Sequence, residues 1–175
     1  MGQNSKNVSP FSNENRKLYV VEHIQSAMLE LLEEKELYEI SISELCDLAG
    51  VGRASFYRNF TSKEDVVKKC VYHKLTEWQN THPFENTPST RQFIYELFLQ
   101  LEQHKDFYGL IYKRKQHEYI KDFILEATQF DPDQDIVPAY SSAYLAFFIY
   151  GWIEVWLRRG MKDSAEELAK YLPEK

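Results

Sequence analysis

Residues 41–64 read SISELCDLAGVGRASFYRNFTSKE, and this stretch decides the fold. Ser41, with a glutamate three residues later, forms a capping box that predicts the start of a short helix. Gly50 predicts the end of that helix, and Gly52 predicts the N-cap of a second helix over residues 53–60. Two short helices joined by a glycine-bearing turn indicate a helix-turn-helix, in which the second helix enters the DNA major groove.

The second predicted helix has two chemically different sides. On a helical wheel Phe56 and Phe60 fall together, which indicates a buried side, whereas small and basic residues occupy the remainder. The residues predicted to lie at the DNA interface are Ser41, Gly52, Arg53, Ala54, Ser55, Tyr57, Arg58 and Lys63.

Individual roles follow from side-chain chemistry and position. We expect Arg53 and Ser55 to reach base edges, Arg58 to reach a phosphate or a base edge, and Ser41 to contact a phosphate. Tyr57 fits a DNA contact or packing against the neighbouring helix. Lys63, which we expect at a phosphate, also fits a solvated helix start.

The same residues carry a resemblance to a known family. The order Ala49-Gly-Val, a basic residue at position 53, two small residues, Phe56-Tyr-Arg, a phenylalanine, and then Ser62-Lys-Glu resembles the TetR family of bacterial transcription regulators. Two residues depart from the pattern, because Gly52 replaces the usual serine cap and Ala54 stands where glycine is common. The resemblance implies a sequence-specific regulator that binds palindromic double-stranded operator DNA as a homodimer.

Glycine and proline usage predicts an all-α protein. The 175 residues include only six of each, mostly where helices are expected to end. We expect a three-helix DNA-binding domain over residues 13–75 and a C-terminal helical bundle over residues 76–175 that forms the dimer. Pro83 and Pro88 delimit a break between helices, and Pro173 is expected to close the last helix.

Net charge argues for local rather than general nucleic-acid binding. The chain carries a formal charge of −6, which disfavours a protein that coats DNA indiscriminately. Residues 50–74 nevertheless hold six basic and two acidic residues, so the one basic segment coincides with the predicted reading helix and the start of the next helix.

The chain shows no pattern typical of an enzyme, a metalloprotein or a cofactor site. Cys46 and Cys70 lack CxxC spacing, which indicates reduced thiols of a cytoplasmic protein or, alternatively, a redox sensor. The five histidines lack metal-ligand spacing, and no glycine-rich phosphate loop or clustered Ser/His/Asp set is present. The alternative of a different class is a dimeric adaptor that does not bind DNA.

Residues 139–157 form an apolar stretch in which Glu154 is the single charge. Its serines and tyrosines argue against a membrane span, and a helix that is apolar all round needs cover on every side. The resemblance implies that the last two helices pair with their twins in a dimer, and the chain's own core is the alternative for each residue. The predicted interface residues are Phe147, Phe148, Gly151, Trp152, Trp156 and Leu168.

Aromatic residues concentrate in the C-terminal part of the chain, where 19 of the 26 lie after residue 74. This composition fits an apolar ligand pocket or a solid core. The predicted pocket residues are Tyr95, Phe98, Tyr108, Tyr112, Phe123 and Tyr144. The resemblance favours a repressor released by a small apolar or aromatic effector, and control by a partner protein is the alternative.

The regulatory sense stays open at this stage. Residues 150–168 resemble the C-terminal region of a TetR subgroup that includes activators of dihydroxyacetone kinase genes, so activation is the alternative to repression. Neither the operator sequence, the regulated genes nor the effector follows from the residues.

Overall fold

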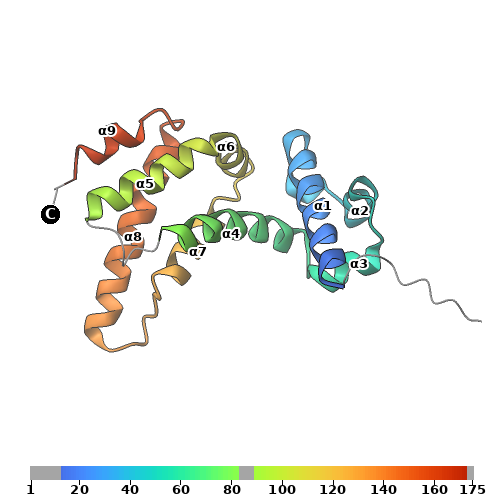
Figure 1. Ribbon diagram of the computed structural model, residues 1–175, viewed down its shortest axis with the longest axis horizontal. Helices are drawn as coiled ribbons and strands as arrows, with labels where there is room; N and C mark the ends of the chain where they lie inside the picture. Colours follow the sequence, from blue (N-terminus) through green and yellow to red (C-terminus); the bar gives the residue numbers. More distant parts are fainter. Residues whose placement is uncertain (1–12, 83–88, 173–175) are drawn as a thin grey trace, which may run out of the picture. The chain divides into compact units, whose positions relative to one another are not determined.

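The computed structural model describes residues 13–82 and 89–172, which form helices and no strand (Figure 1). The predicted all-α fold is confirmed. The chain divides into two compact units, Met1–Val67 and Lys68–Lys175, so the division lies inside a helix, upstream of the domain boundary that we predicted after residue 75. The predicted break at 83–88 and Pro173 lie outside the described residues.

The first unit is a small bundle built around two crossing helices. Its elements are α1 (Asn13–Glu34), a short 3-10 helix (Leu37–Glu39), α2 (Ile42–Ala49), α3 (Arg53–Asn59) and the first residues of α4 (Lys63–Thr81). Helix α1 packs against both α2 and α3. Ile24 and Met28 of α1, Leu45 of α2 and Phe56 of α3 are 0% exposed and form the centre of this core.

Local capping explains where α2 and α3 begin and end. The hydroxyl of Ser41 accepts a hydrogen bond from the amide of Glu44 at 3.1 Å, which satisfies one of the free donors at the start of α2. Gly50 closes α2 in the left-handed region at φ +65°, where a side chain would be strained. Gly52 is the N-cap of α3, as predicted, and offers no side-chain cap.

The second unit contains the rest of α4 and five further helices. These are α5 (Thr90–Gln103), α6 (Lys105–Lys113), α7 (Glu118–Ala127), α8 (Ile136–Arg158) and α9 (Ala165–Ala169). Helix α9 lies alongside α5 (Figure 1), where the amide of Ala165 donates to Glu102 Oε1 at 2.9 Å. The capping box that we predict from Ser164 is present, but α9 has only five residues.

Helix α8 is long, apolar and incompletely covered. Its 23 residues are long and apolar enough to cross a membrane by length and composition, and 17% of its most apolar window is buried. A buried core helix of a soluble protein passes the same test, so this property alone is weak evidence for a membrane span. The membrane test therefore does not explain why so much of α8 is exposed.

Candidate DNA-binding interface

Helix α3 is anchored from one side by two phenylalanine rings. Phe56 is 0% exposed and Phe60 is 2% exposed, and their ring centroids are 5.7 Å apart. Both rings project into the core beneath α3, as the helical wheel predicts. The helix is only seven residues long, so this burial, rather than its own hydrogen bonds, holds it in place.

The opposite side of α3 faces solvent. Arg53, Ala54, Tyr57 and Arg58 are exposed, and Ser55 is half-buried. Tyr57 is 55% exposed and touches Phe56 edge-on at 5.3 Å, so its ring leans on the core while much of its surface stays accessible. The side chains that we predict to reach DNA therefore lie together on the accessible side of α3.

Ser55 and Arg58 act as a pair. The Arg58 guanidinium donates from Nη2 to the Ser55 hydroxyl oxygen at 2.7 Å, one helical turn apart. Asn59 donates from Nδ2 to the Ser55 carbonyl at 2.8 Å. The serine hydroxyl accepts from the guanidinium in this contact, so its own proton can still be donated, and the guanidinium has further donors beyond this one.

Lys63 has a structural role that we did not predict. Its Nζ donates to the carbonyl of Ile40 at 2.9 Å and to that of Tyr38 at 3.1 Å. These carbonyls lie where the 3-10 helix ends and the chain turns into α2. The side chain therefore ties the start of α4 to the entry of α2, whereas we expected either a phosphate contact or a solvated helix start.

A second cation ties α1 to α2. Lys35 and Glu44 form a short ion pair, which raises the pKa of the Lys35 ammonium and lowers that of the Glu44 carboxyl. Glu44 lies in the first turn of α2, and its carboxylate pairs with Lys35, the first residue after α1. At the start of α4, the Ser62 hydroxyl accepts from the amide of Asp65 at 3.1 Å.

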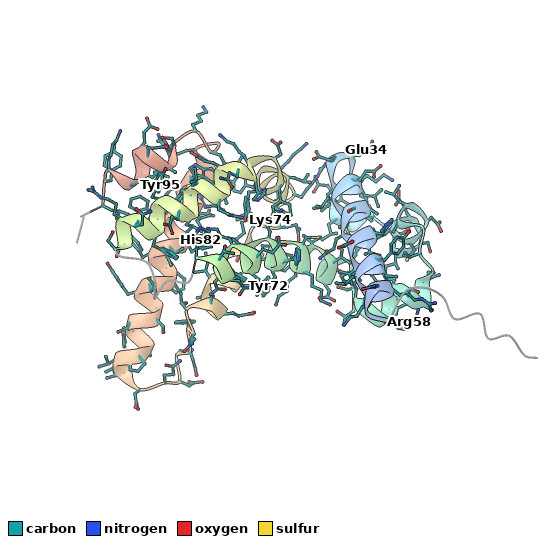
Figure 2. All side chains as sticks on the ribbon, viewed as in Figure 1. Glu34, Arg58, Tyr72, Lys74, His82 and Tyr95 are labelled. Atoms are coloured by element: carbon teal, nitrogen blue, oxygen red, sulfur yellow. The ribbon has the colours of Figure 1, made fainter. Side chains whose placement is uncertain are left out.

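The structure adds two basic residues that sequence reasoning missed. Arg16 and Lys17 are exposed on the first turns of α1 and line an open groove together with Arg58 of α3. Figure 2 shows Arg58 at the end of this unit where α1 begins. No sequence motif marks these two residues, and the DNA contacts that we predicted begin at Ser41. Their position beside Arg58 becomes visible only when α1 is packed against α3.

Comparisons with known proteins agree with this geometry. Residues 24–70 match the family model described as bacterial regulatory proteins, tetR family, so the match covers the helix-turn-helix and the helices that support it. Residues 24–70 are therefore a TetR-family DNA-binding domain.

A curated relative extends the similarity beyond that domain. It is an uncharacterized HTH-type transcriptional regulator, YxbF, of Bacillus subtilis (strain 168), 22% identical over 163 residues. The alignment covers 84% of the present chain and 42% of the relative, so the chain spans about two fifths of the relative's length.

The second unit contains a cavity, but not where we predicted it. The cavity holds about 320 Å³ and is lined by residues of α4, α5, α7 and α8. Among the six predicted pocket residues, Phe123 alone is in its wall. Phe98 and Tyr108 are 0% exposed and fill the core, where Phe98 packs edge-on against Trp156.

The other three predicted pocket residues point elsewhere. Tyr144 is 76% exposed on α8, so it faces outward rather than into the cavity. Tyr112 packs against the ring of His117 at 4.9 Å, and Tyr95 is half-buried on α5 outside the cavity wall. The aromatic side chains that do line the cavity with Phe123 are Trp78, His82 and Phe93.

The predicted interface residues fall into three groups. Phe147 is 52% exposed, Gly151 is exposed, and Phe148 and Trp152 are half-buried, so α8 presents them at its surface. Trp156 is 1% exposed and donates from Nε1 to the Asp163 carbonyl at 2.9 Å, so it belongs to the subunit's own core. Leu168 is half-buried on the short helix α9.

Proposed function

We propose that this TetR-family regulator is a cytoplasmic homodimeric repressor that binds a palindromic operator and is released by a small effector. The observation that carries the proposal is the outward face of α3, where Arg53, Ser55, Tyr57 and Arg58 stand over the Phe56–Phe60 anchor. Occupation of an operator blocks transcription without any further contact, so repression is the simplest outcome of this geometry. Activation by the same dimer is the alternative that the C-terminal resemblance favours.

Selection from a random duplex library tests DNA recognition directly. We expect a recovered motif with two inverted half-sites whose centres are separated by about one or more helical turns. Each good base contact contributes only about 1 to 3 kcal/mol, so a single helix-turn-helix would discriminate poorly within a genome. Recovery of no motif would favour the non-DNA-binding adaptor, and recovery of a single half-site would contradict the dimer.

The dimer proposal rests on the uncovered side of α8. Tyr140 and Tyr144 are 75% and 76% exposed, and Phe147 and Val155 are 52% and 56% exposed. These positions recur at helical spacing and form one apolar stripe, and Gly151 within it allows close approach of a second helix. Large exposed apolar patches mark interaction sites, and a second copy of α8 is the matching partner.

Mass measurement in solution tests this arrangement. We expect the wild type to have the mass of a dimer and Phe147→Glu to have that of a monomer, because the carboxylate would be buried without a partner. Tyr38→Glu, which places the same charge at an aromatic residue that is 79% exposed on the first unit, is the matched control and should remain dimeric. A dimeric Phe147→Glu would exclude the α8 stripe as the interface.

The effector proposal rests on the cavity of the second unit. Its wall contains Trp78, Phe93 and Phe123, and its polar groups include Gln79 and Thr128. No aspartate, glutamate, lysine or arginine is among its described lining residues, which favours a neutral ligand. An engineered cavity of about 150 Å³ binds benzene, so about twice that volume accommodates one or two rings.

Helix α4 provides the route from the cavity to the DNA-binding unit. Leu75, Trp78 and Gln79 of α4 line the cavity, and the same helix begins at Lys63, in the first unit. A ligand that binds better to one position of α4 would shift the dimer toward a different distance between its two DNA-binding units. At that distance the dimer no longer fits the operator and is released. A partner protein that moves α4 would have the same effect without filling the cavity.

Introducing a negative charge at Gln79 tests the effector proposal. We expect indole-3-ethanol to bind the wild type at least about tenfold more tightly than tryptamine or indole-3-acetate, which share its ring but carry a charge. Gln79→Glu should improve tryptamine binding, whereas Asn80→Glu, one residue along on the exposed side, should not. Fluorine NMR of fluorotryptophan-labelled protein reads Trp78 directly, and unchanged Trp78 signals with all three probes would argue against an indole-sized ligand.

A further inference from the structure

The first unit carries a basic groove outside the helix-turn-helix. The groove is open, has a volume of about 990 Å³, and lies between the first turns of α1 and the outer side of α3. Its lining includes the cations Arg16, Lys17 and Arg58, and one acid, Glu22. This is an excess of positive charge in a chain whose formal charge is −6.

The cations of α1 stand at the end where they do not help the helix. A helix dipole favours acids at its N-terminus and cations at its C-terminus. Arg16 and Lys17 follow soon after the first residue of α1, whereas its last five residues include Glu30, Glu33 and Glu34 and no cation. Figure 2 shows Glu34 at the opposite end of α1 from Arg58. Helix stability therefore does not account for this arrangement.

The two charged ends of α1 act independently. The glutamates lie 13 to 18 residues beyond these cations, about 20 to 27 Å along the helix axis, which is more than twice the screening length of about 8 Å at physiological salt. The glutamates at the far end therefore do not neutralise Arg16 and Lys17. Neither cation makes an ion pair with a residue in the described part of the chain, so both charges are available to a ligand.

The groove continues the face that we propose for DNA. Arg58 and Ser55, which form the hydrogen-bonded pair on α3, belong to its lining. Leu18 and Tyr19 add apolar surface and are 57% and 54% exposed. Cations beside small apolar surfaces suit a sugar-phosphate backbone, in which charged phosphates alternate with apolar sugars.

We infer that this groove is a second phosphate-binding site, in which Arg16 and Lys17 hold the DNA backbone that flanks the bases read by α3. The inference rests on the proposed DNA-binding function and adds contacts outside the helix-turn-helix. These contacts carry no base information. They increase affinity for every sequence and lengthen the stretch of duplex that each subunit covers.

Salt dependence measures such contacts. Each lost phosphate contact reduces the magnitude of the slope of log K against log salt concentration by about 0.9. Relative to about 1 M salt, this makes the affinity of the variant at 0.15 M about fivefold weaker than that of the wild type. We expect Arg16→Gln/Lys17→Gln to lose up to about two contacts per subunit. Affinities for the selected operator and for a scrambled duplex should fall by the same factor, so that the specificity ratio is unchanged.

A matched pair controls for the loss of net charge. Lys162→Gln/Lys170→Gln removes two exposed lysines from the second unit and should leave the slope unaltered. Uncharged methylphosphonates placed singly along the flanking backbone locate the contact. At the relevant phosphates they should weaken the wild type and the control pair but not the Arg16/Lys17 variant, which has already lost that contact.

The outcomes distinguish this inference from the proposed function. A wild type that selects no operator refutes DNA recognition and this site together. A wild type that selects an operator, together with an Arg16/Lys17 variant whose salt slope equals that of the wild type, leaves the proposed function intact and overturns the phosphate site alone. Equal slope losses in both double variants would assign the effect to net charge, and would also overturn it.

Discussion

Replacing Lys63 with methionine is expected to loosen the entry to α2. Methionine keeps most of the aliphatic stem and removes the ammonium group. The ammonium donates to the carbonyls of Ile40 and Tyr38 at 2.9 and 3.1 Å. These carbonyls lie next to Ser41, the N-cap of α2, so their loss should affect the first turn of α2 as well as the 3-10 helix.

The magnitude follows from the two hydrogen bonds. A hydrogen bond to a charged group contributes about 1.5 to 3 kcal/mol when buried and less when water competes. The bond to Ile40 is partly buried and that to Tyr38 is exposed, so about 2 kcal/mol for the pair is a reasonable total. This corresponds to roughly a thirtyfold change in the local opening equilibrium.

Hydrogen exchange read by mass spectrometry measures this opening. Peptides that cover residues 36–49 should exchange roughly thirtyfold faster in Lys63→Met than in the wild type. Peptides from α8 should exchange at the wild-type rate, because they belong to the second unit. A urea titration of the full chain, followed by a probe in the first unit, should show the same loss in free energy of unfolding.

One combination of results would refute this reasoning. If exchange over residues 36–49 is unchanged and the salt slope of operator binding falls by about 0.9 per subunit, Lys63 contacts a phosphate instead. The role that we predicted from sequence would then stand, and the carbonyl contacts would contribute nothing measurable.

Three further predictions concern single residues. Ser41→Ala should lower the free energy of unfolding of the first unit by about 1 kcal/mol, measured by urea titration, and Ser41→Asp should restore it, because the amide of Glu44 loses and then regains an acceptor. Arg53→Ala should reduce discrimination between matched and scrambled duplexes by about 1 to 3 kcal/mol in binding titrations, and an unchanged specificity ratio would remove Arg53 from base recognition. Burial raises the pKa of the Cys70 thiol to about 12, so the thiol stays protonated as the pH rises from about 7 to about 9. Alkylation of Cys70 should then depend on unfolding by urea rather than on pH, and rapid labelling of the folded chain would contradict this.

The helix-turn-helix was predictable because its signals are local. The Ser41 cap, the left-handed glycine at position 50 and the phenylalanines four residues apart each act within one or two helical turns. Such signals determine where short helices begin, end and turn their apolar side. The exposed polar side of α3 follows directly, because a helix with one anchored side leaves the other free.

The cavity was not predictable from composition. Phe98, Tyr108 and Tyr144 have the same aromatic character as Phe123, yet two fill the core and one faces outward. Which side of a helix faces a cavity depends on how helices far apart in sequence pack together. The residues that line the cavity come from four helices and from the ends of two of them, and no local pattern relates them.

By itself, the sequence determined the class of the protein, the boundaries of α2 and α3, and the side of α3 that carries Arg53 and Tyr57. Capping and side-chain periodicity are properties of neighbouring residues, so they can be read along the chain. The tertiary structure alone decided that Lys63 binds the carbonyls before α2, that Trp156 is core, and that Arg16 lies beside Arg58. These are contacts between segments that lie apart in the sequence, and they exist only once the helices that carry them have packed.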